Sequence, residues 1–97
     1  MFTVIHVALS VTNLENSISF YKRFGFEVYK KWKASDLSIQ ITLMKLKEFT
    51  LELFCYRDYV EMPHSALSVA TDLPVIGTKH FALQVKDLSA EIGRAHV

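Results

Sequence analysis

The stretch VIHVALSVTNLENSISF, residues 4–20, joins a strand pattern to a helix pattern and decides the fold. Residues 4–11 alternate between large apolar side chains and small or polar ones. The apolar set is Ile5, Val7, Leu9 and Val11. A period of two predicts a β-strand with one apolar face, and it places His6 and Ser10 on the opposite face.

A helix is predicted directly after this strand, over residues 14–24. Apolar side chains recur at helical spacing from Leu14 to Phe24. Asn13 is suited to be the N-cap, and a capping box that begins at Thr12 is the alternative. Gly25 stands where a helix commonly ends in a left-handed residue.

Three further strands are expected at residues 26–32, 37–46 and 49–56, because each segment is rich in β-formers or alternates. The short polar connection Lys47-Glu48 predicts a hairpin between the last two. In 37–46 the more apolar set is expected to face the helix. This set is Leu37, Ile39, Ile41 and Leu43.

A second copy of the opening pattern begins at residue 78. The stretch TKHFALQVKDLSAEIGR, residues 78–94, repeats it at a shift of 74 positions and places His80 at the position of His6. A strand at 78–85 and a second helix capped by Asp87 are therefore expected. The sequence reads as one α+β domain, 1–97, with a βαβββ module (1–56), a connector (57–77), the start of a second module (78–92) and an atypical tail (93–97), as if a two-module protein were cut short.

Composition excludes several classes of function. The formal net charge is +1 and the charges are interspersed, so neither a nucleic-acid surface nor a membrane surface is indicated. The apolar stretches are of strand length, and the first ten residues do not form a signal peptide. The single cysteine, Cys55, excludes an intrachain disulfide and favours a cytoplasmic location.

The sheet face opposite the helix is expected to form a ligand pocket, because it is too polar for a core and unusually rich in reactive side chains. The residues predicted on this face are His6, Ser10, Ser38, Gln40, Thr42, Thr50, Glu52, Phe54, His80 and Gln84. Among them, Ser10, Gln40, Thr42, Phe54 and Gln84 are predicted to line the pocket.

His6, Glu52 and His80 are the residues on this face that could carry chemistry. If the two copies are related by a pseudo-twofold axis, both imidazoles converge near it, and Glu52 points to the same face. Two imidazoles and a carboxylate suit Zn, Ni, Fe or Mn. The same groups could act as acid and base without a metal, and a single histidine in a strand is more often structural.

The opening of the chain resembles the vicinal oxygen chelate superfamily, which includes glyoxalase I, bleomycin-resistance proteins, fosfomycin-resistance proteins and extradiol dioxygenases. The resemblance rests on a histidine-bearing strand, a polar cap, a Ser and Phe-Tyr in the helix, a Gly-Phe exit, a Glu in the fourth strand and a second histidine-bearing strand. In this sequence these are His6, Asn13, Ser17, Phe20-Tyr21, Gly25-Phe26, Glu52-Leu53 and His80.

The resemblance implies paired βαβββ modules that form a cupped sheet, in which a small molecule is bound or transformed. Metal-dependent members would hold a divalent ion at the positions of His6, Glu52 and His80, and Glu52 is then the expected catalytic residue. An enzyme of this kind would be a lyase, an isomerase or a dioxygenase. The alternatives are a metal-free protein that binds an antibiotic-type ligand, and a dimeric remnant without catalytic activity.

A homodimer is expected as well. A complete cup of the family contains eight strands, and this chain is predicted to supply five. A second chain could place its own first module where the rest of the cup belongs, or the strand at 78–85 could be exchanged between chains.

Overall fold

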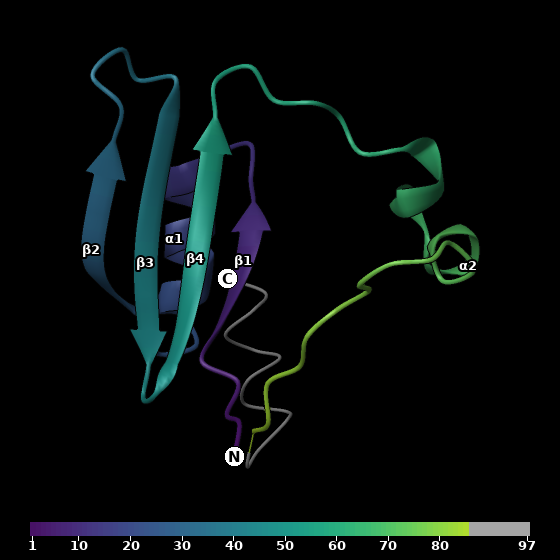
Figure 1. The fold of residues 1–97 in the computed structure, drawn as a ribbon, viewed down its shortest axis with the longest axis horizontal. Helices are drawn as coiled ribbons and strands as arrows, with labels where there is room; N and C mark the ends of the chain where they lie inside the picture. The colour runs from purple at the N-terminus through teal and green to yellow at the C-terminus, as the bar shows by residue number, and fades with distance from the viewer. Residues whose placement is uncertain (86–97) are drawn as a thin grey trace.

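The computed structural model describes residues 1–85 and shows a four-stranded sheet with one helix behind it and an extended arm to one side (Figure 1). The predicted second helix from Asp87 and the predicted tail lie outside the described residues. The elements in chain order are β1 (His6–Ser10), α1 (Leu14–Lys22), β2 (Glu27–Lys33), β3 (Ile39–Leu46), β4 (Phe49–Tyr56), η1 (His64–Leu67) and α2 (Val69–Asp72).

The strands lie in the order β1-β4-β3-β2, so the first and fourth strands are neighbours. β1 pairs with β4 in parallel, while β3 pairs antiparallel with both β4 and β2. Two parallel strands must be joined by a crossover connection. Here α1, β2 and β3 make up the connection between β1 and β4. The predicted α+β class and the βαβββ order are confirmed.

Local sequence sets the two ends of α1. The Asn13 side chain accepts a hydrogen bond from the backbone N–H of Asn16 at 3.0 Å, which satisfies one of the free donors at the start of the helix. Gly25 adopts a φ of +97°, and a Cβ at this position would lie 3.3 Å from Leu46 Cδ1. The predicted cap and the predicted stop are therefore confirmed, although α1 itself ends two residues earlier than expected.

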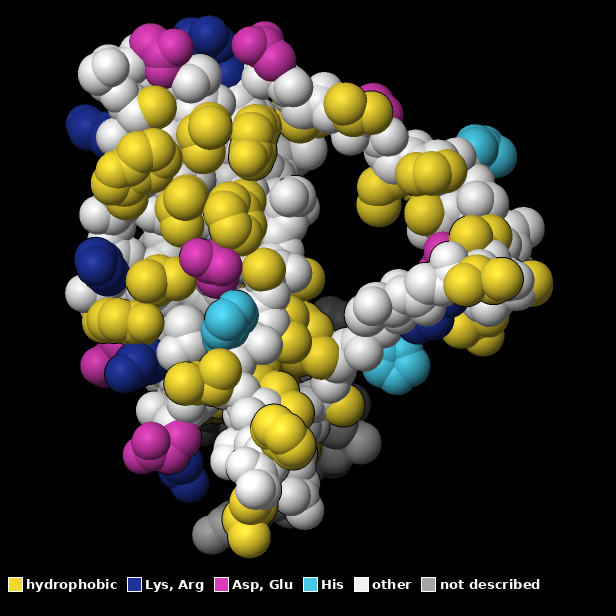
Figure 2. Space-filling model, in the orientation of Figure 1, with side chains coloured by type: hydrophobic (Ala, Val, Ile, Leu, Met, Phe, Trp, Pro, Cys, Tyr) yellow, Lys and Arg dark blue, Asp and Glu magenta, His cyan; other side chains and the backbone are white. Residues whose placement is uncertain are grey.

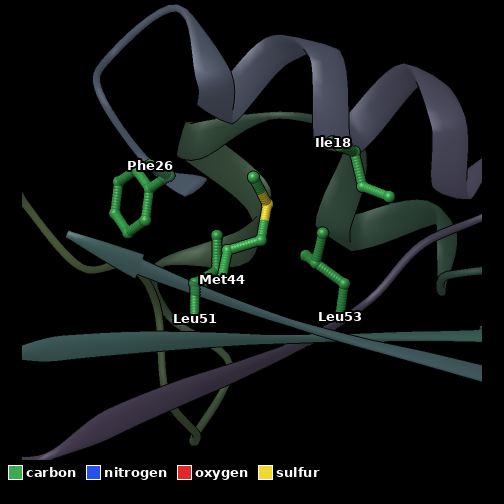
Figure 3. Packing of buried hydrophobic residues seen from close by; sticks show 5 residues of the cluster. All are labelled: Ile18, Phe26, Met44, Leu51 and Leu53. Carbon is green, nitrogen blue, oxygen red and sulfur yellow. The ribbon is translucent and has the colours of Figure 1, made fainter. Parts of the chain in front are cut away.

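The hydrophobic core lies between α1 and one face of the sheet (Figure 3). Its fully or nearly buried members are Ile18, Phe26, Met44, Leu51 and Leu53. Ile18 reaches down from α1, and the other four come from the strands or from the residue that leads into β2. Ten further apolar side chains are partly buried against these five, and a core of this size gives a small module only modest stability.

Aromatic rings extend the core toward one end of the sheet. Tyr21 packs edge-on against Phe26, Phe26 against Phe49, and Phe49 stacks on Phe81 at a centroid distance of 6.3 Å. Burial raises the pKa of the Tyr21 hydroxyl above its usual value. Phe81 therefore ties the later part of the chain to the module.

Residues 78–85 do not form the predicted strand. An alternating segment becomes a strand only when a neighbouring strand supplies hydrogen-bond partners, and none of the described residues pairs with this one. Phe81 is half-buried against the core, whereas His80, Gln84 and Val85 are exposed.

The connector forms an arm, residues 57–77, that stands beside the sheet on the side of β1 (Figure 1). It contains the short helical turns η1 and α2, and none of its residues is buried. Lys79 joins the end of the arm to α2, because its Nζ donates to the Asp72 carbonyl at 2.7 Å. Among the described residues, no helix has the length and apolar character needed to cross a membrane.

Replacement of Leu53 with alanine should lower the free energy of unfolding by about 2–5 kcal/mol, because it empties a fully buried position in the small core. The matched control is Leu67→Ala in the arm, where the side chain is 63% exposed and the expected change is within about 0.5 kcal/mol. Urea denaturation followed by circular dichroism measures both. Equal effects of the two substitutions would contradict the assignment of the core.

Candidate functional site

The sheet has one face packed on α1 and one open face. Residues that pair across neighbouring strands point to the same side, so the pairing register assigns every side chain to a face. Leu51 and Leu53 of β4 are buried against α1, which leaves Thr50, Glu52 and Phe54 on the open face. The expectation that Glu52 lies opposite the two leucines agrees with this register.

Glu52 lies in the central row of the open face. Its pairing partners are Ala8 on β1 and Leu43 on β3, and Leu43 in turn pairs with Lys30 on β2. The carboxylate is partly buried by these mainly apolar neighbours. Its position between two strands makes it available to a ligand that lies over the middle of the sheet.

His6 lies next to Glu52 along the diagonal of the β1–β4 ladder. It pairs with Thr50, two residues before Glu52 on the same strand, and it is exposed. Diagonal neighbours on one face are close enough for long side chains to meet. The imidazole and the carboxylate are therefore two potential metal ligands that lie near each other on the surface of the sheet. We call His6 and Glu52 the donor pair, because each could donate an electron pair to a metal ion.

An apolar row lies beside this donor pair. Ser10, Phe54, Ile41 and Trp32 pair in sequence across the four strands. Phe54 and Ile41 are partly buried, and Trp32 is 54% exposed. Figure 2 shows this face with hydrophobic side chains spread over the strands and with acidic and histidine side chains among them.

A bulge in β2 brings two aromatic side chains to the open face. Val28 pairs with Met44 and Trp32 with Ile41, so four steps along β2 correspond to three along β3. The extra residue reverses the alternation, and Tyr29 and Trp32 come to the same side. Lys45 lies over the Tyr29 ring, with its Nζ 4.7 Å from the centroid. Strict alternation along the strand predicted at residues 26–32 would put Tyr29 and Trp32 on opposite faces, and this expectation is wrong because of the bulge.

The predicted faces of β3 are reversed. Thr42 pairs with Leu53 and Gln40 with Cys55, so both lie on the helix side, and Thr42 is 0% exposed. Ser10 and Phe54 lie on the open face as expected, whereas Gln40 and Thr42 cannot line a pocket there. Ile41 and Leu43, which were expected in the core, take their place.

His80 is not brought to the donor pair. It is exposed on the segment that follows the arm, and the same is true of Gln84. Within residues 1–85, no three His, Cys, Asp or Glu side chains form a group that could hold a metal ion. The described part of the chain thus supplies His6 and Glu52 as a pair, and a third ligand from His80 stays a prediction.

A cavity of about 740 Å³ continues the open face at the far ends of β1 and β4. Ser10 and Tyr56 belong to both the open face and the cavity. Polar side chains from the residues just before α1 and from its first turn form one wall, and the first residues of the arm form another. These two walls are Thr12, Asn13, Asn16, Ser17, Asp58, Tyr59, Val60, Glu61 and Met62.

Sequence reasoning missed this cavity because its second wall comes from residues without periodicity. It also missed the apolar character of the open face, although one signal was available. A two-residue connection at Lys47-Glu48 pairs Leu46 with Phe49, and this register alone puts Met44 beside Leu51 on the helix side.

The comparisons with known proteins identify the family. Residues 3–96 match the Glyoxalase/Bleomycin resistance protein/Dioxygenase superfamily, and the chain belongs to this superfamily. Its fold is similar to the crystal structure of SMU.1112c, with a TM-score of 0.72 and 26% sequence identity, over 97% of this chain and 72% of that chain. No curated protein matches the sequence.

The fold is also similar to the crystal structure of the glyoxalase family protein from Enterococcus faecalis. The TM-score is 0.75 at 23% identity, and the match covers 97% of this chain and 70% of that chain. At this identity the likeness concerns the fold alone. The family named by the sequence resemblance is thus confirmed, and the fold agrees with it.

Replacement of Thr42 with valine should raise the free energy of unfolding. The Thr42 hydroxyl is buried and has no hydrogen-bond partner among the described residues, and such a group costs about 1–3 kcal/mol. Thermal denaturation of Thr42→Val tests this, with the exposed Thr78→Val as the control that should change little. A less stable Thr42→Val variant would show instead that the hydroxyl has a partner or faces solvent.

Proposed function

We propose that the open face of the sheet binds a small molecule with an apolar body and polar oxygen atoms, over His6 and Glu52. The observation that carries this proposal is the placement of a partly buried carboxylate and an exposed imidazole inside an apolar sheet face. Ligand sites are commonly mainly apolar, with a few polar groups that fix orientation. The family membership supports the same conclusion.

The apolar body of the ligand would lie on the row of Phe54, Ile41 and Trp32. These side chains are partly to half exposed, so a ligand would remove apolar surface from water without requiring the sheet to move. The cavity beside Ser10 and Tyr56 offers room for the rest of a larger ligand. The proposed specificity is therefore for flat or amphipathic molecules.

A divalent metal is the cofactor that this donor set fits. His6 supplies a neutral nitrogen and Glu52 a carboxylate oxygen, which are ligands typical of Zn, Ni, Mn and Fe sites. Two protein ligands leave coordination positions open for His80 and for the small molecule. A bound ion would act as a Lewis acid toward a ligand oxygen, as in a lyase, isomerase or dioxygenase of the family.

The protein groups have roles of their own in this proposal. Glu52 can accept a proton or a hydrogen bond from the ligand, because its carboxylate faces the open side. His6 can orient the polar end of the ligand from β1. If no metal binds, the same surface would sequester an antibiotic-type ligand, and the aromatic side chains favour this second candidate.

We further propose that the protein acts as a cytoplasmic homodimer. The single cysteine supports a reducing compartment. The many exposed apolar side chains of the open face and the arm support a second chain as the partner.

Titration with Ni²⁺ tests the metal-dependent form of the proposal. The fluorescence of Trp32, the only tryptophan, reports binding on the open face, and calorimetry gives the stoichiometry. We expect saturable binding, with at least a tenfold loss of affinity in His6→Ala and in Glu52→Gln and little change in the unfolding midpoint of Glu52→Gln. His64→Ala is the matched control, because His64 is exposed in η1.

The variants also separate the alternatives. A weaker Ni²⁺ affinity in His80→Ala would support His80 as the third ligand. An unchanged affinity would mean that His6 and Glu52 bind the metal without His80. Wild-type affinity in both His6→Ala and Glu52→Gln would contradict the proposed metal site. The metal-free candidate then requires that a hydrophobic probe such as 8-anilinonaphthalene-1-sulfonate still changes the Trp32 emission.

A further inference from the structure

We propose that Lys45 binds a carboxylate group of the ligand, so that the open face is specific for small organic acids with an apolar body. This inference rests on the ligand site proposed above and names the class of its ligand. Tyr29 has a positioning role, because its ring holds the lysine in place.

Lys45 lies on the open face, next to the donor pair. It pairs with Thr50 on β4, and Thr50 pairs on its other side with His6 on β1. Glu52 follows Thr50 by two residues, so it is a diagonal neighbour of both Lys45 and His6. Long side chains reach across such a diagonal. The ammonium group, the imidazole and the carboxylate therefore surround one area of the sheet, where the polar end of a ligand would lie.

The other lysines of the sheet are less suited to this role. Lys31 and Lys33 pair with residues of β3 that face α1, so both lie on the helix side. Lys30 lies on the open face, but on the outermost strand and two strands away from β4. In the register of the sheet, Lys45 is thus the lysine nearest to the donor pair.

The charge of Lys45 is not neutralised by any carboxylate among the described residues. Its cross-strand partner on β2 is Glu27, yet no ion pair joins the two, and none joins Lys45 to Glu52. Glu27 and Lys30 give β2 one charge of each sign on this face, so Lys45 and Glu52 remain as two separate opposite charges. An ammonium group in this situation can donate strong hydrogen bonds to an anionic ligand.

Tyr29 fixes the position of the ammonium group. The Lys45 Nζ lies 4.7 Å from the centroid of the Tyr29 ring, and the negative face of an aromatic ring attracts a cation. Tyr29 reaches the open face because of the bulge between Val28 and Lys30, and bulges commonly re-aim a side chain beside an active site. Lys45 is exposed, so its ammonium group is accessible. Because the lysine is held before the ligand arrives, less side-chain entropy is lost on binding.

The spacing of the sheet indicates how such a ligand would lie. Four residues along a strand span about 13 Å, which separates the backbone of Lys45 from the row of Phe54, Ile41 and Trp32. The lysine side chain spans part of this distance, and Glu52 lies in the row between. The carboxylate would lie at Lys45, further oxygen atoms at Glu52 and the apolar body on the row.

A carboxylate fits this position better than a phosphate does. A single lysine offsets a single negative charge, whereas a phosphate ester carries nearly two. Glu52 is close enough to repel additional negative charge on the ligand. The assigned ligand class is therefore a monoanionic carboxylic acid.

A matched acid and amide test this assignment. Phenylpropanoate and phenylpropanamide share one apolar body and differ in charge. Each is titrated into the protein without added metal ions, and the emission of Trp32, the only tryptophan, reports binding. We expect the acid to bind about tenfold more tightly than the amide, because a hydrogen bond to a charged group contributes about this factor. In Lys45→Met this preference should disappear, while the affinity for the amide should change little.

Two substitutions of Tyr29 test its positioning role. Tyr29→Leu should reduce the preference for the acid, whereas Tyr29→Phe should keep it, because phenylalanine retains the ring face. Lys31→Met is the matched control for the loss of a lysine, because Lys31 lies on the helix side and its variant should keep the wild-type preference. Circular dichroism confirms that each variant is folded.

The outcomes separate this inference from the proposed function. Equal affinities of the wild type for the acid and the amide, or an unchanged preference in Lys45→Met, would refute the role of Lys45 while the open face remains a ligand site. Binding of neither probe would also overturn the inference. The Ni²⁺ titration of the His6 and Glu52 variants then decides separately whether the proposed site stands.

Discussion

The pairing register between β3 and β4 is the constraint on which the structure depends. Leu51 lies beside Met44 and Leu53 beside Thr42. The odd-numbered residues of β4 and the even-numbered residues of β3 therefore face α1. A shift of a single residue would exchange the two faces of β3 and bring Ile41 and Leu43 into the core. The open face would then carry Thr42 and Gln40, and the surface around Glu52 would become more polar.

This register has an energetic cost that points to function. The core contains five buried apolar residues, while Ile41, Leu43, Phe54 and Trp32 remain at least partly in contact with water on the other face. The buried hydroxyl of Thr42 has no partner among the described residues, which adds to the cost. The surface left exposed is therefore best understood as a surface that binds something.

Much of the fold could be predicted from the sequence, because the first half of the chain has strong periodicity and clear end signals. The alternation of β1 and β4, the Asn13 cap and the Gly25 stop all agree with the structure. From them follow the correct faces of His6, Glu52 and Phe54. The family resemblance came from the same residues and is confirmed.

The failures have identifiable causes. In β3 apolar residues occur at both odd and even positions, so hydrophobicity alone predicted the wrong face for the helix side. The two-residue hairpin turn fixes the register and thereby the correct face. The β2 bulge has no sequence signal, and it moves Trp32 to the face of Tyr29. Residues 78–85 alternate as clearly as β1 does, but among the described residues they have no strand beside them, and alternation without a partner does not make a strand.

The central proposal is that the open face, at His6 and Glu52, is the ligand-binding site of the protein. Diffraction from crystals grown with Zn²⁺, recorded on both sides of the zinc absorption edge, tests it most directly. The account predicts an anomalous peak about 2.0–2.2 Å from a His6 ring nitrogen and a Glu52 carboxylate oxygen. Zinc bound at other histidines with no peak between His6 and Glu52 would contradict it.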